Sequence, residues 1–458
     1  MVNLPKSIEK VKKLILPGEE CYLVGGAVRD SLLNRSSKDL DIVYSGDTRA
    51  VARRLADLTS GVFFMLDEER DTCRVITNDE KGEKISFDFT RLQGGTIESD
   101  LHLRDFTINA MAVNIAIPGS VIDPLKGGRD LIEKWLRPCS PTSFQDDPLR
   151  VIRAVRYSVL LGLKMESKTI DQLRQAVNFL DRVSNERKRD ELFKIFDNGR
   201  SSVSVQLLFS FGIFPFCGIY QFSNFERTLL QMRILDSILD YFCADPRSPG
   251  REYFLLASLA AKLGKYKKKM QKYLLQQNDS GRTLKSLDLL GMLLYGTQGA
   301  EFIDELPLSK EEQTHLFSLL ENKKSFHGLG VKKSPVENRT LFHYFRKIRN
   351  TGNDLALLSL ADTASVVSAE MDQDLWLGEL GICDQVFDLW FDHPEVLNPE
   401  ALLTGTDLMF EFDLKQGPLI GELLEGLREE QAAGMVKTRT EALDWVEGKI
   451  HVNVLKSE

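Results

Sequence analysis

The spacing of apolar residues changes once along this chain, and that change restricts the fold class. Roughly the first 135 positions contain short apolar runs bounded by Gly, Asp and Asn, which predict strands. The runs lie at residues 21–24, 40–44, 62–66, 73–77 and 85–90. From Pro148 onward, apolar residues recur at every third or fourth position, as at Val151 and Val155, which predicts helices. We therefore expect an α+β fold, in which a mixed sheet with helices is followed by an all-α region.

Length and composition narrow the class of protein. A chain of 458 residues predicts roughly two to four domains. Hydrophobic residues make up 43% and charged residues 28%, which excludes disordered, collagen-like and disulfide-scaffold classes. No stretch approaches the roughly 18 apolar residues of a membrane span, and the N-terminus lacks the apolar core of a signal peptide. We expect no membrane partner and a cytoplasmic location. The 6 cysteines form no CxxC pair, so we expect reduced, packed thiols.

The formal charge of −8 means that nucleic acid would have to be held by local basic patches. Residues 262–272 contain six lysines and no acidic residue. A second basic run includes Lys323, Lys332, Lys333, Arg339, Arg346, Lys347 and Arg349. Each run alone fits the solvated face of a helix. Together, downstream of an N-terminal region with catalytic features, they favour a surface for a phosphate backbone.

The first two predicted strands carry the most informative motif. Gly25 and Gly26 follow the first strand and precede a predicted helix, so backbone amides and the helix N-terminus favour a bound phosphate. Asp39 and Asp41 lie on the next strand and project from the same face, because strand side chains alternate. Two carboxylates so placed repel unless a cation lies between them. Magnesium prefers such carboxylates together with phosphate oxygens.

A third acid follows in the strand predicted at residues 85–90. Its apolar residues alternate with Asp88, which therefore faces the opposite side. If this strand neighbours residues 40–44, Asp88 joins Asp39 and Asp41; otherwise it lies on a polar strand face in water. Three carboxylates holding two magnesium ions about 3.5–4 Å apart suit in-line nucleotidyl transfer to a 3′-hydroxyl. These three acids are the candidate catalytic and metal-binding residues.

Residues 103–114 place polar side chains in an apolar stretch. Arg104 offers a guanidinium fork for triphosphate oxygens, and Asp105 and Asn109 offer contacts to the sugar. The alternative for Asp105 is to start a turn or helix.

The segment from Asp147 predicts a helix with a basic face. Asp147 fits a helix N-cap, and Arg150, Arg153 and Arg156 recur every three residues. Asp147 and Arg150 offer the acceptor and donors needed to read the edge of C or A, and the remaining arginines offer phosphate contacts. A later helix offers Glu186, Arg187 and Lys194 as ion-pair partners around this one.

The motifs LVGGAVRD, DLDIV, RDFTINAMA, DDPLRVIRAVRY and NERKRDELFK occur in this order over roughly residues 20–200. This set resembles the motifs of class II tRNA nucleotidyltransferases, the CCA-adding enzymes, and the related bacterial poly(A) polymerases. The resemblance implies a polymerase-β-like nucleotidyltransferase head at residues 1–137. It implies a helical neck at 138–200, a body at 201–335 and a tail at 336–458, which hold tRNA. The implied substrates are tRNA, CTP and ATP, joined without a nucleic-acid template.

The resemblance also assigns residues to roles. Asp39 and Asp41 fall on the metal pair, Asp88 on the third acid, Gly26, Arg29 and Arg104 on triphosphate contacts, and Asp147, Arg150 and Arg153 on nucleotide-selecting positions. Leu103 and Asp146 depart from the arginine and glutamate that are usual in the family. Ala261 and Lys262 occupy the His-Asp positions of relatives with a phosphohydrolase domain, so we expect no phosphatase activity.

Several alternatives remain open. Residues 91–100 are short where many CCA-adding members carry a flexible loop, so a CC-adding or A-adding specialist remains open. A poly(A) polymerase is the alternative substrate class, although the C-terminus lacks a long basic tail. A catalytically silent RNA-binding protein is disfavoured by the intact acids. The oligomeric state is left undetermined.

Overall fold

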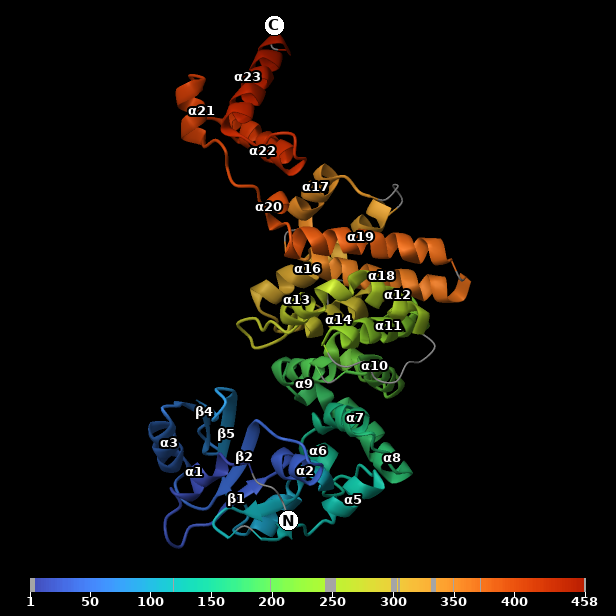
Figure 1. The fold of residues 1–458 in the computed structure, drawn as a ribbon. Helices are drawn as coiled ribbons and strands as arrows, with labels where there is room; N and C mark the ends of the chain where they lie inside the picture. The colour runs from blue at the N-terminus through green and yellow to red at the C-terminus, as the bar shows by residue number, and fades with distance from the viewer. Residues whose placement is uncertain are drawn as a thin grey trace. The chain divides into compact units, whose positions relative to one another are not determined.

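The computed structural model describes residues 5–456 except 118, 198, 244–252, 298–302, 304, 331–334, 349 and 371. The chain divides into two compact units (Figure 1). The first contains the residues up to Glu191 together with Leu207–Phe216, and the second contains Leu192–Gln206 and the residues from Cys217 onward. None of the described helices has the length and apolar character needed to cross a membrane.

A mixed sheet of 7 strands forms the core of the first unit, in the order β3-β4-β5-β2-β1-β6-β7. The strands are β1 (Cys21–Val24), β2 (Asp39–Tyr44), β3 (Val62–Asp67), β4 (Thr72–Asn78), β5 (Lys84–Arg91), β6 (Ala112–Asn114) and β7 (Val121–Ile122). Strands β2 and β5 are parallel, and the other neighbours are antiparallel. The mixed sheet and its first five strands are confirmed, each strand to within one residue at its ends. The short strands β6 and β7 were missed.

Helices of the first unit cover both faces of the sheet. They are α1 (Ile8–Lys12), α2 (Gly26–Leu32), α3 (Thr48–Thr59), α4 (Ile97–His102), η1 (Thr107–Asn109), α5 (Gly127–Glu133), α6 (Ser143–Asp146), α7 (Arg150–Leu161), α8 (Ser167–Ala176) and η2 (Val177–Arg182). Helix α3 begins at a cap in which Asp47 accepts from the backbone N–H of Ala50. Its apolar stripe, including Val51 and Leu55, packs on one face with Leu40 and other strand residues. Helix α4 covers only part of the opposite face of the sheet. The part of that face formed by β2 and β5 is therefore available for a site.

On the face of the sheet that α4 partly covers, the cross-strand register places three charged residues in a row. Arg74 on β4 pairs with Asp88 on β5, which pairs with Asp41 on β2, which pairs with Val24 on β1. Directly paired residues lie on the same face of a sheet. A basic, two acidic and an apolar side chain therefore succeed one another across four strands.

Helices joined by loops make up the described residues of the second unit, with no strand among them, as expected. The helices α9 (Asn185–Asp197) and α10 (Ser201–Ser210) contribute residues to both units, as does η3 (Phe214–Cys217). The others are α11 (Phe225–Cys243), α12 (Tyr253–Leu263), η4 (Gly264–Tyr266), α13 (Lys267–Leu274), α14 (Leu284–Tyr295), α16 (Lys310–Gly330), α17 (Asn338–Ile348), α18 (Gly352–Glu370), α19 (Gln373–Phe391), α20 (Pro394–Leu397), α21 (Gly405–Glu411), α22 (Pro418–Ala432) and α23 (Arg439–Lys456). Helices α18 and α19 lie side by side (Figure 1), and the sequence from Leu355 to Ala361 is buried throughout. All six cysteines are free, and all but Cys243 are buried, as expected.

A stability prediction follows from the packing of α5 on η1. A Cβ at Gly127 would lie only 1.9 Å from the carbonyl oxygen of Thr107. We expect Gly127→Ala to force the backbone apart and to destabilise the first unit by about 1–3 kcal/mol. The measurement is the thermal midpoint by calorimetry. Gly378→Ala is the control: a Cβ on this α19 residue meets nothing within 4 Å, so its midpoint should be unchanged or raised. Equal midpoints for both variants would contradict the packing described here.

Candidate active site

Three carboxylates share one area of the sheet. Asp41 on β2 is the direct register partner of Asp88 on the parallel strand β5, and Asp39 lies two residues before Asp41. Neighbouring strands are about 4.8 Å apart, and alternate residues along a strand are about 6.7 Å apart. The expectation that residues 85–90 neighbour residues 40–44, and that all three acids face the same side, is therefore confirmed.

Neighbouring side chains hold two of these acids in place. Arg74 donates to both carboxylate oxygens of Asp88, each at 2.7 Å. Ser86 donates to Oδ1 of Asp39 at 2.6 Å. A two-pronged guanidinium contact of this kind is geometrically specific. Arg74 was not identified as a site residue from the sequence, although it lies within the strand predicted at residues 73–77.

The surroundings of Asp41 disfavour the charged form of its carboxyl group. Desolvation by the surrounding protein is the largest influence and raises the pKa of Asp41. The Arg104 guanidinium opposes this rise, whereas the Asp88 and Asp39 carboxylates add to it. A cation placed between these acids would relieve the repulsion that raises the pKa.

The three acids can be compared with the ligands that the expected magnesium ions prefer. Asp39 and Asp41 supply the carboxylate oxygens that Mg²⁺ prefers, on one face and in a field of excess negative charge. Asp88 fits the same role only when Arg74 releases its oxygens. Among the described residues, the group of three whose ligand atoms lie within 4.8 Å of one another is in the second unit, not here. The acids therefore fit a divalent ion in kind and lie on one face of the sheet, but the ligand atoms of all three do not come within 4.8 Å of one another, and both oxygens of Asp88 accept from Arg74.

Gly25 lets two charged groups approach the same stretch of backbone. Its φ of +70° lies in the left-handed region that favours glycine. A Cβ at this position would lie 3.2 Å from Nη1 of Arg104 and 3.2 Å from Oδ2 of Asp41. Gly26 then begins α2, as the glycine pair predicted. The absence of a side chain at residue 25 therefore keeps a guanidinium and a carboxylate close together.

A pocket of about 780 Å³ adjoins this area of the first unit. Its charged lining consists of Arg70, Asp100, Arg104, Asp146, Asp147, Arg150, Arg182 and Arg187. Arg104 connects the pocket with the acids, because its Nη1 lies beside Gly25 while its Nε and Nη2 donate to Asp100 at 3.2 and 3.1 Å. The pocket is of a size that suits a small-molecule ligand, and its guanidinium groups suit an anionic one.

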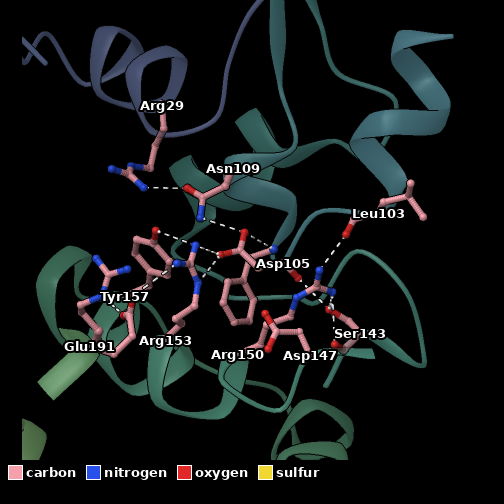
Figure 2. Close-up of polar contacts among 12 residues, drawn as sticks. Arg29, Leu103, Asp105, Asn109, Ser143, Asp147, Arg150, Arg153, Tyr157 and Glu191 are labelled. Carbon is pink, nitrogen blue, oxygen red and sulfur yellow. Dashed lines mark hydrogen bonds and ion pairs between the residues drawn. The ribbon is translucent and has the colours of Figure 1, made fainter. Parts of the chain in front are cut away.

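A buried polar network lies next to this pocket (Figure 2). Arg153 donates from Nε and Nη2 to Oδ2 of Asp105, at 3.0 and 2.5 Å. Asn109 donates to Oδ1 of Asp105 at 3.1 Å and accepts from Nη1 of Arg29 at 2.6 Å. Burial is the largest influence and would raise the pKa of Asp105, but the Arg153 guanidinium and the hydrogen bonds from Asn109 and the backbone of Phe106 together lower it. Four predicted site residues from three segments therefore meet in one chain of contacts.

The same network ends on a residue that the sequence did not reveal. Glu191 on α9 is buried and accepts from Arg153 at 3.3 Å and from Arg156 at 2.8 Å. The guanidinium of Arg156 also lies 4.3 Å from the ring centroid of Tyr157. The predicted helix of ion-pair partners is confirmed in Arg187, which pairs with Asp147 at 2.8 Å. Glu191 could have been found from its spacing, because it lies one turn beyond Arg187 on the same helix.

Arg150 and Asp147 form one wall of the pocket. Arg150 donates from Nη1 to the backbone oxygen and hydroxyl of Ser143, at 3.1 and 2.7 Å, and from Nη2 to the backbone oxygen of Leu103 at 2.7 Å (Figure 2). Helix α7 begins at Arg150, and its N-cap is Leu149. The N-cap role predicted for Asp147 is therefore wrong in position: its side chain accepts from the N–H of Leu149, in the turn before the helix.

Several residues of the basic runs in the second unit are paired with acids. Lys262 and Lys265 both contact Asp384, and Lys269 contacts Asp392. Arg339 pairs with Glu429 and Glu430, and Arg346 pairs with Glu425. Lys332, Lys333 and Arg349 lie outside the described residues. The phosphate-binding surface expected from these runs stays a prediction.

Three acids on a mixed sheet, beside a guanidinium-lined pocket, define the class: the chain is a nucleotidyltransferase. Two family models match it: the poly A polymerase head domain over residues 21–137, and the probable RNA and SrmB-binding site of polymerase A over residues 162–217. A CC-adding tRNA nucleotidyltransferase of Geobacter sulfurreducens is 31% identical, over 93% of this chain and 91% of that protein. An A-adding tRNA nucleotidyltransferase of Deinococcus radiodurans is 28% identical, over 93% and 94%. The chain belongs to the class II tRNA nucleotidyltransferase family, as its motifs predicted.

Comparison with solved structures supports the fold. The Thermotoga maritima CCA-adding enzyme complexed with tRNA matches 98% of this chain and 97% of its own, with a TM-score of 0.61 and 21% identity. At that identity the likeness shows the shared fold, which confirms the predicted head followed by helical domains.

A prediction tests the buried ion pair. We expect Arg153→Met to leave the Asp105 carboxylate without its cationic partner and to destabilise the first unit by about 3 kcal/mol at pH 7. The folded-state pKa of Asp105 is lowered, so the pair contributes stability above the unfolded pKa of about 3.9 and loses it as pH falls through the folded pKa. In the variant Asp105 takes up a proton at higher pH. The gap in thermal midpoint should therefore narrow between pH 7 and pH 5.

Arg129→Met is the matched control, because Arg129 pairs with Glu133 on the exposed side of α5. Its midpoint should differ little from that of the unmodified protein at either pH. A pH-independent gap for Arg153→Met would show that lost packing, and not the charge of Asp105, determines its stability.

Proposed function

We propose that this chain adds nucleotides from CTP or ATP to the 3′ end of tRNA without a nucleic-acid template. The observation that carries the proposal is the register of β2 and β5, which places Asp41 opposite Asp88 beside the arginine-lined pocket. Family membership supports tRNA as the acceptor. The solved relative bound to tRNA supports the same substrate class.

Asp39 and Asp41 are proposed to hold two Mg²⁺ ions, with Asp88 as the third ligand once Arg74 withdraws. When bound, such ions activate the attacking 3′-hydroxyl and stabilise charge on the transferred phosphorus. Arg104 is proposed to bind the triphosphate. This role is supported by its place in the pocket lining and by its Nη1, which lies close to the Gly25 backbone, as does Oδ2 of Asp41.

Arg29 is proposed to position Asn109. It is only 6% exposed and donates to both Asn109 and Asp30. A guanidinium so enclosed would have to break two contacts to reach a phosphate. Asn109 in turn is held by Asp105, so these residues act as a rigid support for the wall of the pocket.

Base selection is assigned to Asp147 and Arg150. Both line the pocket, and together they present a carboxylate acceptor and a guanidinium donor on one wall. Ser143 and Leu103 fix two prongs of Arg150, while Arg187 fixes Asp147. An exocyclic amine of C or A would take the place of Arg187 at the carboxylate.

The specialisation is proposed to be CC addition. The two relatives named above span nearly the whole chain, and both are named for partial activities. The CC-adding protein has the higher identity of the two. We further propose the division into head (1–137), neck (138–200), body (201–335) and tail (336–458), the last three binding the tRNA.

The carboxylate assignment predicts a loss of activity without a loss of fold. We expect Asp41→Asn to lower nucleotide incorporation roughly 100-fold or more, since even removal of groups that only support metal ligands costs about 10–100-fold. Incorporation of labelled CTP into tRNA measures the rate, and a filter assay measures tRNA binding, which should remain. Asp57→Asn, an exposed change on α3, is the matched control and should leave both unchanged. Near-normal turnover in Asp41→Asn would refute the metal site.

The choice of nucleotides is tested with three forms of tRNA. Purified protein is given Mg²⁺ and tRNA that lacks CCA, ends in CC, or is complete, with CTP and ATP supplied singly and together. We expect two C residues on the first tRNA and no addition to the others. Addition of A to the CC-ended tRNA would overturn the CC assignment, and long A tracts would indicate a poly(A) polymerase. No incorporation at all would overturn the proposed function itself.

A further inference from the structure

A second group of metal-ligand side chains lies in the helical unit, away from the three acids of the sheet in sequence. Asp288 on α14, His315 on α16 and Asp354 on α18 place one ligand atom each within 4.8 Å of the others. Asp288 and Asp354 are fully buried, and the side chain of His315 is 12% exposed. Three helices that are distant in sequence therefore converge on one point.

The atoms that face this point lack hydrogen-bond partners. Both carboxylate oxygens of Asp288, Nε2 of His315 and Oδ1 of Asp354 are buried without one. Nε2 of His315 lies 3.6 Å from Oδ1 of Asp288, which is beyond hydrogen-bond distance. Buried polar atoms without partners are rare and destabilising, and a bound ligand would supply the partners that these atoms lack.

The outer oxygen of Asp354 is fixed by a neighbour. Tyr273 on α13 donates to Oδ2 of Asp354 at 2.6 Å. That hydrogen bond leaves Oδ1 to face Asp288 and His315. A phenol that orients a carboxylate in this way is typical of the residues that support metal ligands.

The charges of the group also call for a cation. Among the described residues, Asp288 forms an ion pair with His315, and Asp354 forms none. With both carboxyls ionised, the two beside one imidazole would carry excess negative charge, which is costly in a low-dielectric interior. Burial, and then the Asp354 carboxyl, raise the pKa of Asp288 well above its usual range. A divalent ion with a neutral imidazole would leave the group uncharged.

We propose that Asp288, His315 and Asp354 bind a divalent transition-metal ion of the zinc class, which joins α14, α16 and α18. The mixed nitrogen and oxygen donors favour zinc, cobalt or nickel over magnesium, which prefers oxygen ligands alone. The partial exposure of His315 marks the side from which an ion enters. The role is structural, because the ion holds together three helices of the tRNA-binding region proposed above.

The test begins with the Asp39→Asn, Asp41→Asn double variant, so that the sheet carboxylates do not contribute binding. The purified chain is stripped with a chelator and titrated with Co²⁺, whose visible absorption reports imidazole and carboxylate ligation, and with Zn²⁺ in calorimetry. We expect one ion per chain. The thermal midpoint should rise by about 5 °C or more when Zn²⁺ is 100-fold above its Kd.

Further variants locate the ion. Asp288→Asn and His315→Gln, added separately, should abolish the absorption band and the stabilisation, whereas His343→Gln should keep both, because His343 is exposed and pairs with Glu429. Absence of Co²⁺ and Zn²⁺ binding in the double variant would overturn the proposal and leave a proton-sharing group of two carboxyls and an imidazole. Binding that survives both Asp288→Asn and His315→Gln would overturn it as well. Nucleotide incorporation by the unmodified chain is measured separately, so failure here does not depend on the proposed activity.

Discussion

The buried ion pair between Asp105 and Arg153 is the interaction on which the rest of the first unit depends. It joins the loop after α4 to helix α7, two segments 48 residues apart. Because the Asp105 side chain is only 7% exposed, removal of Arg153 would leave its charge in a low-dielectric interior. The pair therefore fixes the position of α7 against the sheet. That position brings Arg150 into the lining of the pocket that Arg104 connects to the acids.

Arginines in this unit divide into those that support and those that face the pocket. Arg29, Arg153 and Arg156 are committed to Asn109, Asp105 and Glu191, respectively, and all three also lie near the ring of Tyr157. Arg104, Arg150 and Arg187 line the pocket instead. Sequence motifs group all of them alike, because a motif reports residue type and order. Burial and partners separate the two sets.

The sequence predicted most of the sheet because five strands are short apolar runs bounded by Gly, Asp or Asn. Alternation along a strand placed Asp39 and Asp41 on one face, whereas the place of Asp88 beside them depended on the pairing of β5 with β2, which the sequence left open. Strands β6 and β7 were missed because they span only three and two residues, too few to show a period. Glu191 was missed because its partners Arg153 and Arg156 lie on another helix, and Arg74 because its pairing with Asp88 depends on the register of two strands. The same holds for Asp288, His315 and Asp354, which lie on separate helices with no motif among them.

The contact between Arg74 and Asp88 has a consequence for how cations share the sheet face. Both oxygens of that carboxylate already serve a guanidinium, so an arriving ion competes with a fixed internal rival of the same sign. If two Mg²⁺ ions bind as proposed, this competition weakens the binding of the ion that relies on β5. At Asp41 on β2 the nearby guanidinium, that of Arg104, makes no hydrogen bond to the carboxylate among the described residues. The ion at β5 would then bind firmly only when the phosphates of an incoming nucleotide add oxygen ligands of their own. A guanidinium on a neighbouring strand would in this way make occupancy of the proposed second ion site depend on the presence of substrate.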